Sequence, residues 1–471
     1  MSFRVEKDSL GEKKIPAQSY YGIQTLRAVE NFPITGIPIH KEITFALAEV
    51  KKASALANIE TGMLKFSIGA NIVKAAEEIS NGQLSEEFIV DSIQGGAGTS
   101  INMNMNEVIA NRALELMGRS KGEYFYCSPN THVNMSQSTN DTVPTAVKIA
   151  AFQLTQQLID TLEQLVEGFK QKEKEFDDVI KMGRTHLQDA VPIRLGQEFG
   201  AYRSVIERDL KRISQAAKEL LSINMGATAV GTGLNAQEDY IKKVTEHLGK
   251  QLNIPLYSAE NLIDSTQNTD AYTTLSATLK VSAVNLSKIC NDIRLMASGP
   301  FTGLNELSLQ PRQPGSSIMP GKVNPVMAEV VNQTAFQIIG NDQTICMASE
   351  SGQFELNVMV PVLSFNLLQS IKIYKNAIDV FYRYLLCDLK ANKKKCQSYV
   401  DNSLGIITAL NPYIGYETAA QLVKEAIATK KTIVEICLER GLLSKEELEE
   451  ILNPFEMTTP GIAGNRFLLK N

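Results

Sequence analysis

Long helical patterns of apolar residues are the feature that most restricts how this chain of 471 residues can fold. An α-helix turns once in 3.6 residues, so apolar side chains three and four positions apart share one face. The first pattern runs from Val147 through Ala151, Leu154, Leu158, Leu162, Leu165 and Phe169. The second contains Leu275, Leu279, Leu286, Ile289, Ile293 and Met296, with Ser282 at its one polar position. Helical patterns also cover residues 197–223, 326–349 and 361–390, whereas strand-like runs are few and short, which predicts a mainly α fold.

The first long helix carries apolar residues on a second face, at Ile159 and Val166. Such a helix packs on several sides, which predicts a central long-helix bundle completed by other subunits. Changes in composition predict three domains. Residues 1–140, richer in Gly and Pro, would form an N-terminal mostly helical domain, and residues 141–395 the central helix-bundle domain. Residues 396–471 would form a small C-terminal helical domain, in which Ser444 and Glu447 fit a capping box.

Composition excludes several classes of protein. A net charge of −5 is modest for this length, so no broad basic surface for nucleic acid is predicted. No apolar run reaches the length of a membrane span, and the charged first residues do not resemble a secretory signal. The six cysteines form no CxxC pair, which is typical of reduced thiols in a cytoplasmic protein.

Four polar, glycine-rich segments interrupt the helical patterns: residues 95–106, 136–142, 183–188 and 315–325. The last contains Gly315 and Gly321 followed by Lys322, but five residues separate the glycines where a phosphate-binding P-loop has four. Val323 also stands where that loop needs Ser or Thr, so we reject a P-loop. The segment is compatible with a catalytic loop, or with a connection in which Asn324 caps a helix and Pro325 takes its first position.

The other segments also have purely structural explanations. Residues 138–141, Ser-Thr-Asn-Asp, have the composition of a helix cap. The four histidines, His40, His132, His186 and His247, are too dispersed to predict a metal site. His186 differs from the others because it lies in the polar break at residues 183–188, between two long helices.

Taken together, the four segments resemble those of the fumarase/aspartase superfamily, and the resemblance covers essentially the whole chain. Residues 315–325 resemble the signature loop of that superfamily. Within it, residues 98–104 (GTSINMN), Ser138-Thr139-Asn140-Asp141 and Pro325-Val326-Met327 resemble the aspartate ammonia-lyase branch. Fumarases typically have Gln after the first Thr, SSND at the second place and Pro-Thr-Gln at the third. Ala328, where close relatives often have Pro, departs from the pattern outside the catalytic loop.

The resemblance implies a three-domain subunit whose bundle forms a tetrameric helical core, with each site built from segments of three subunits. It implies reversible elimination of ammonia from L-aspartate to give fumarate, with no cofactor and no catalytic metal. The alternative is a class II fumarase. A non-catalytic homologue recruited as a structural protein is disfavoured because Ser316, Lys322 and His186 are all present.

Removal of the proton next to the β-carboxylate of aspartate leaves a carbanion, which is stabilised when its charge spreads into that carboxylate as an enediolate. A site for this reaction needs fixed hydrogen-bond donors around the carboxylate oxygens. The resemblance assigns Ser316 as the general base, with the backbone amides of Ile318 and Met319 and the charge of Lys322 stabilising its alkoxide. It assigns Thr99, Ser138 and Thr139, assisted by Ser317, to the β-carboxylate. It assigns Thr185, Lys322 and Asn324 to the α-carboxylate, and Asn140 and His186 to the surroundings of the amino group.

Overall fold

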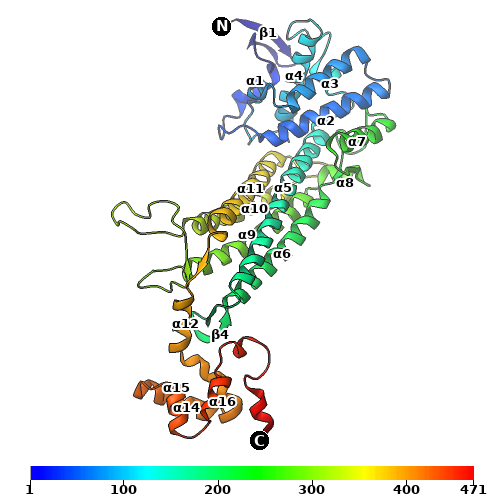
Figure 1. Cartoon of the computed structure of the whole chain (residues 1–471). Coiled ribbons are helices and arrows are strands. Elements are labelled where there is room, and N and C mark those ends of the chain that lie inside the picture. Colours follow the sequence, from blue (N-terminus) through cyan, green and yellow to red (C-terminus); the bar gives the residue numbers. More distant parts are fainter. Residues whose placement is uncertain (1, 471) are drawn as a thin grey trace. The chain divides into compact units, whose positions relative to one another are not determined.

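The computed structural model describes residues 2–470 and is mainly α-helical, as predicted (Figure 1). Five long helices dominate it: α5 (Thr139–Glu175), α6 (Leu195–Glu219), α9 (Asp270–Met296), α10 (Val326–Glu350) and α11 (Val360–Phe381). They coincide with the five regions in which the apolar patterns predict helices. Described strands occur only as two-stranded pairs. No helix of the described residues is long and apolar enough to cross a membrane.

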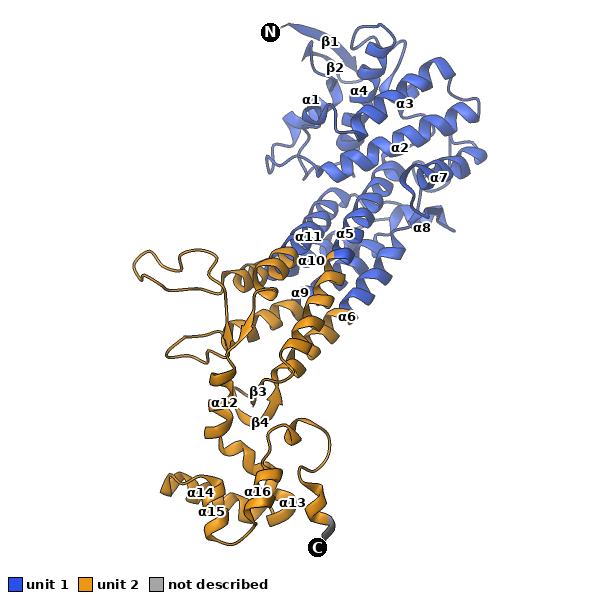
Figure 2. Ribbon diagram, viewed as in Figure 1, with its two compact units in different colours: residues 1–160, 209–284, 334–376 blue, residues 161–208, 285–333, 377–471 orange. Residues whose placement is uncertain are grey.

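The chain divides into two compact units (Figure 2). Unit 1 consists of residues 1–160, 209–284 and 334–376, and unit 2 of residues 161–208, 285–333 and 377–471. The divisions fall within the five long helices. The three predicted domains, with boundaries after residues 140 and 395, divide the chain differently from these two units and stay a prediction.

Unit 1 begins with an antiparallel hairpin, β1 (Phe3–Asp8) and β2 (Gly11–Pro16). Helix α2 (Lys41–Glu60) packs against α3 (Phe66–Ser80) and α7 (Glu238–Leu252), and α4 (Thr99–Leu116) packs against α3 and α1 (Ile23–Asn31). Smaller elements of this unit are η1 (Ser85–Glu87), η2 (Pro129–Val133), α8 (Leu262–Gln267) and the parallel pair β5 (Ser222–Ile223) and β6 (Tyr257–Ser258).

The long helices of unit 1 combine buried apolar stripes with buried polar bonds. Ala151, Leu154 and Leu158 are buried as their spacing predicts, and each buried leucine contributes about 1.5–3 kcal/mol. Ser282, the polar position of the second stripe, lies 2.7 Å from the hydroxyl of Tyr374, which joins α9 to α11. Asn341 of α10 likewise donates 2.9 Å to the Ser370 hydroxyl of α11. Such bonds require one rotational setting of each helix.

Unit 2 contains the antiparallel hairpin β3 (Ile180–Thr185) and β4 (Gln188–Arg194). A cluster of aromatic rings fills its long-helix portion: Phe169, Phe176, Phe199, Tyr202 and Phe381. Its other elements are β7 (Leu307–Ser308), η3 (Tyr382–Leu386), β8 (Lys390–Ala391), α12 (Lys393–Asn402), η4 (Leu404–Leu410), α13 (Asn411–Ile414), α14 (Tyr416–Thr429), α15 (Ile433–Glu439), α16 (Lys445–Ile451), η5 (Glu456–Thr458) and η6 (Asn465–Lys470).

The C-terminal helices of unit 2 enclose a small apolar core centred on Leu410, Leu422, Ile436 and Leu448. The predicted capping box is confirmed. The Ser444 hydroxyl accepts from the backbone amide of Glu447, and the Glu447 carboxylate accepts from that of Ser444.

Candidate active site

The segment at residues 95–106 leads into helix α4, and Thr99 is the first residue of that helix. Gly96 and Gly98 have positive φ angles, and a Cβ on Gly98 would lie 3.0 Å from the side chain of Val143. The glycine therefore allows the start of α4 to lie against the first turns of α5. The exposed Thr99 hydroxyl donates 2.7 Å to the carbonyl of Gly96.

The segment at residues 136–142 starts helix α5, and it is both a cap and a candidate site. Ser138 precedes the helix, its hydroxyl accepts from the amide of Asn140, and the Asp141 carboxylate accepts from the Ser138 amide at 2.9 Å. The capping interpretation of these residues is therefore confirmed. The Thr139 hydroxyl, nearly buried, accepts from the Asn102 side chain of α4 at 3.1 Å. The Asn140 amide is held by the carbonyl of Ala229 at 2.7 Å.

Asp141 is fully buried beneath this segment. Its second carboxylate oxygen accepts from the amide of Thr228 at 3.0 Å. Burial raises the pKa of Asp141 to about 7, and its backbone hydrogen bonds oppose that shift. Thr228 has a φ of 56°, a rare conformation for a β-branched residue and a mark of local strain. The Asp141 carboxylate thus joins the start of α5 to a strained turn.

In unit 2, the polar break at residues 183–188 is the tip of the β3–β4 hairpin. Thr185 and Gln188 are paired, and the two residues between them, His186 and Leu187, have φ angles of 55° and 61°. Two left-handed residues in succession are typical of a type I′ turn, usually formed by Asn and Gly. Thr185 and His186 are both exposed. The turn therefore holds His186 in a strained backbone conformation, which is common among functional residues.

The base of this hairpin is held by buried charges. Glu306 is completely buried and accepts from the Arg184 guanidinium at 2.7 Å. Lys181, also buried, donates 2.8 Å to Glu198. Burial raises the pKa of Glu198, and the neighbouring Lys181 opposes that shift. A paired charge network of this kind holds the hairpin in one orientation.

The loop at residues 315–325 folds on itself. The Gly315 amide donates 3.0 Å to the carbonyl of Lys322, and the Asn324 side chain donates 2.7 Å to the carbonyl of Gly315. A Cβ on Gly315 would collide with the Lys322 carbonyl. Helix α10 begins at Val326, and the Asn324 side chain closes the loop, so the interpretation of Asn324 as a helix cap is wrong.

The Ser316 side chain occupies the centre of a small turn in this loop. Its oxygen accepts from the backbone amides of Ile318 at 3.2 Å and Met319 at 3.0 Å. These are the two amides that the sequence analysis expected to surround it. Ser317, Ile318, Met319 and Lys322 are exposed.

The structure therefore gathers the predicted residues into three local groups. Unit 1 brings the start of α4 with Thr99 against the start of α5 with Ser138, Thr139 and Asn140. Unit 2 carries Thr185 and His186 on the hairpin, and Ser316, Ser317, Lys322 and Asn324 on the loop. No hydrogen bond joins hairpin tip and loop in the part of the chain that the structure describes. The roles of all these residues stay predictions.

Sequence reasoning missed the residues that support Thr139, namely Asn102, Asn134 and Lys51. Asn102 lies within the GTSINMN motif, so it was in view but received no role. Lys51 lies four residues after Leu47 and four before Ala55, on the apolar face of α2. A lysine on an apolar helix face was the available signal.

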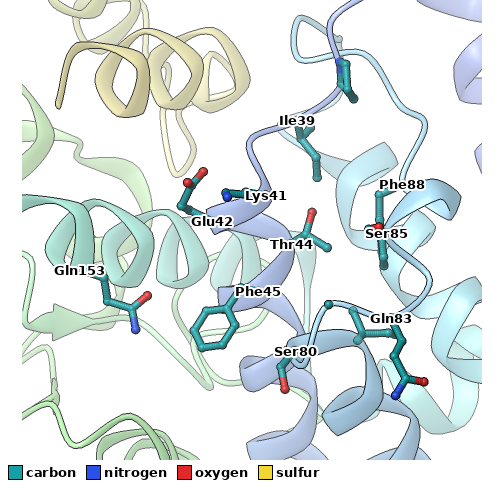
Figure 3. A pocket seen from close by; sticks show the side chains of 13 residues that line it. Ile39, Lys41, Glu42, Thr44, Phe45, Ser80, Gln83, Ser85, Phe88 and Gln153 are labelled. Carbon is teal, nitrogen blue, oxygen red and sulfur yellow. The ribbon is translucent and has the colours of Figure 1, made fainter. Parts of the chain in front are cut away.

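A cavity of about 560 Å³ lies elsewhere in unit 1 (Figure 3). Lys41, Thr44 and Phe45 of α2 line it, together with Gln83 and with Gln153 of α5. None of the predicted site residues lines this cavity. Residues 2–470 also contain no group of three His, Cys, Asp or Glu side chains placed to hold a metal ion.

Two family models match the chain. The family described as Lyase matches residues 11–340, and the family described as Fumarase C C-terminus matches residues 406–459. An aspartate ammonia-lyase of Bacillus subtilis is 62% identical over 468 residues, covering 99% of this chain and 98% of the relative. That of Escherichia coli is 46% identical over 469 residues, covering 99% and 98%.

Solved structures agree with the fold. The fumarate lyase:delta crystallin from Brucella melitensis, bound to cobalt, superposes with a TM-score of 0.94 at 45% identity, covering 98% of this chain and 100% of the other. The class II fumarase from Schistosoma mansoni gives a TM-score of 0.94 at 37% identity with the same coverage.

Proposed function

Because this chain belongs to the lyase family that matches residues 11–340, we propose that it eliminates ammonia from L-aspartate to give fumarate. The observation that carries the proposal is the 62% identity to an aspartate ammonia-lyase across 99% of the chain. The aspartase-like residues at Ser100, Thr139 and Val326-Met327 agree with it. The enzyme is therefore a carbon–nitrogen lyase.

The chemistry requires a base for the Cβ proton and donors for the enediolate. We assign the base to Ser316. A free hydroxyl is far too weak an acid to ionise near neutral pH, so its alkoxide needs strong stabilisation. The amides of Ile318 and Met319 already donate to the Ser316 oxygen, and these hydrogen bonds would strengthen as negative charge develops on that oxygen. The Lys322 ammonium adds positive charge from the same loop.

We assign the donors by the local groups. Thr99, Ser138 and Thr139 would bind the β-carboxylate, with Ser317 assisting, and stabilise it most when it becomes the enediolate. Thr185, Lys322 and Asn324 would bind the α-carboxylate. Asn140 and His186 would lie near the substrate's ammonium group, which leaves as NH3 and takes the electron pair of the C–N bond with it.

We propose that the protein is a cytoplasmic homotetramer in which segments from three subunits complete each site. Within unit 1, helix α10 exposes Phe336 by 65% and Met347 by 60%, and α9 exposes Val281 and Val284. Large apolar side chains exposed on long helices favour burial against another subunit. All six cysteines are free thiols, which agrees with a reducing compartment.

The test follows fumarate by its ultraviolet absorbance, with L-aspartate and L-malate supplied separately at mildly alkaline pH. Fumarate from aspartate alone supports the proposal. Fumarate from malate instead would make the chain a class II fumarase, the second candidate, which the match of residues 406–459 to a fumarase model keeps open. A folded tetramer inactive on both would contradict both activities.

A further inference from the structure

A buried lysine lies behind the proposed β-carboxylate site. Lys51 of α2 has no exposed surface, and its Nζ donates 3.0 Å to the Asn134 side-chain oxygen and 2.9 Å to that of Gln137. No carboxylate lies within salt-bridge distance of it among the described residues. A buried, unpaired lysine is unfavourable for folding, so its presence calls for a function.

Lys51 determines how the Asn134 side chain is oriented. The Lys51 ammonium has hydrogens to donate to both partners and no lone pair to accept with, so the oxygen of Asn134 must face it. The same oxygen accepts from Asn102 and from Asn106, each at 3.1 Å, while the Asn134 amide donates to the Gln137 carbonyl at 3.2 Å. Every contact of Asn134 therefore agrees with one orientation.

The orientation of Asn134 in turn determines that of Asn102. Because Asn134 presents its side-chain oxygen, the amide nitrogen of Asn102 must face that oxygen. The same nitrogen donates 3.1 Å to the Thr139 hydroxyl oxygen. Asn102 is 1% exposed, so no solvent competes for these bonds. Thr142 reaches the opposite, oxygen end of Asn102 at 3.3 Å.

The consequence falls on the Thr139 proton. Because the Thr139 oxygen accepts from Asn102, its own hydrogen cannot point along that bond, and it has no acceptor among residues 2–470. The hydroxyl is thus prepared to donate to a bound anion. Thr99 differs, because its hydrogen is already given to the carbonyl of Gly96.

We propose that Lys51 is a positioning residue that, through Asn134 and Asn102, holds the Thr139 hydroxyl as a hydrogen-bond donor to the substrate β-carboxylate. The inference rests on the proposed function, because it takes the role of Thr139 from there. Burial lowers the pKa of Lys51 to about 7, but the ammonium and the neutral amine both have enough hydrogens for the two observed bonds.

The test is a double-mutant cycle with Lys51→Met and Thr139→Val, measured as kcat and KM on aspartate in folded tetramers. Thr139→Val should lower kcat by about 10²–10³-fold, as expected for the loss of one fixed donor. Lys51→Met should lower kcat by about 10-fold or more with a smaller change in KM, since the donor acts mainly in the transition state. The double variant should match Thr139→Val within about 2-fold, because Lys51 then has nothing left to position.

Two variants separate this role from general damage. Lys51→Gln, which can still donate to Asn134, should recover much of the kcat lost in Lys51→Met. Lys148→Met removes another buried lysine of unit 1, which donates to the Ser222 carbonyl, and its effects should be additive with Thr139→Val. If Lys51→Met does not fold, Asn102→Leu replaces it in the same cycle and should show the same loss of additivity.

The outcomes distinguish the two proposals. Near-normal kcat in Thr139→Val would overturn the assignment of Thr139 to the substrate. A large loss in Thr139→Val with full additivity in the double variant would retain that assignment and overturn the role of Lys51.

Discussion

The segment at residues 136–142 and the loop at residues 315–325 both carry proposed catalytic groups, yet they are built in opposite ways. The first is anchored by buried side chains from other elements, which contact Thr139, Gln137 and Asn140: Asn102, Lys51 and Asn224. The second is closed mainly by its own backbone and by Asn324, and its Ile318 is 83% exposed. The difference separates two tasks. Donors that stabilise a developing charge need rigidity, whereas a loop that admits substrate and then excludes water needs freedom to move.

The largest expected effect is on the loop. Ser316→Ala should lower kcat by about 10²–10⁴-fold, because it removes the proposed base and leaves the amides of Ile318 and Met319 without their acceptor. Steady-state kinetics would measure it, with circular dichroism and gel filtration showing an intact tetramer. Ser308→Ala, at an exposed position of unit 2, is the matched control. Turnover close to that of the parent enzyme would remove Ser316 from the role of base.

A smaller loss is expected at Thr99, on the anchored side. Thr99→Val should lower kcat by about 10²-fold, the lower end for one fixed donor, because its hydrogen must first leave the Gly96 carbonyl. The measurement is a side-by-side comparison with Thr139→Val. If the Thr99 variant lost more than the Thr139 variant, hydroxyl orientation in the free enzyme would not determine donor strength.

A change in the backbone of the loop at residues 315–325 should lower kcat less than the loss of the Ser316 hydroxyl. A Cβ at Gly315 collides with the Lys322 carbonyl, so Gly315→Ala should displace Ser316 and lower kcat by about 10-fold, below the 10²-fold loss that an ångström of misplacement can cause. The melting temperature should hardly change, because the loop is exposed. Gly321→Asn provides the comparison, since Gly321 has a φ of 82° with open space around it and Asn tolerates that conformation. An equal loss of kcat in both variants would show that the close approach of Gly315 to the Lys322 carbonyl is not specifically required.

The last prediction concerns stability rather than turnover, on the anchored side. Burial raises the pKa of Asp141 from 3.8 to about 7, so between these values the folded state binds more protons than the unfolded state. Asp141 therefore makes its full contribution to the free energy of unfolding below about pH 4. This contribution falls as pH rises towards 7, by at most about 1.4 kcal/mol per pH unit. Urea unfolding of the parent and of Asp141→Asn should show this decline as a difference between them. A pH-independent difference would place the pKa of Asp141 near its ordinary value.

Much of the fold could be predicted from the sequence, because helical periodicity is a local property. Leu158, Leu165 and Leu286 are buried as their spacing requires, and the Ser444 capping box is present. The resemblance also led us to expect the amides of Ile318 and Met319 around Ser316, and both donate to its oxygen. The type I′ turn at His186 and Leu187 was not anticipated, because His-Leu is an unusual pair for that turn.

What could not be read from the chain is the relation between residues distant in sequence. The apolar stripes are sufficient to predict a mainly α fold, because each depends on spacing within a few turns, and the four polar segments carry the resemblance to the family. Lys51 and Thr139 stand 88 positions apart in the numbering, and only packing of α2, α4 and α5 in unit 1 places them in one hydrogen-bonded chain. The direction of the Thr139 proton follows from that packing, because a buried amide must match donors to acceptors with whatever neighbours the fold supplies.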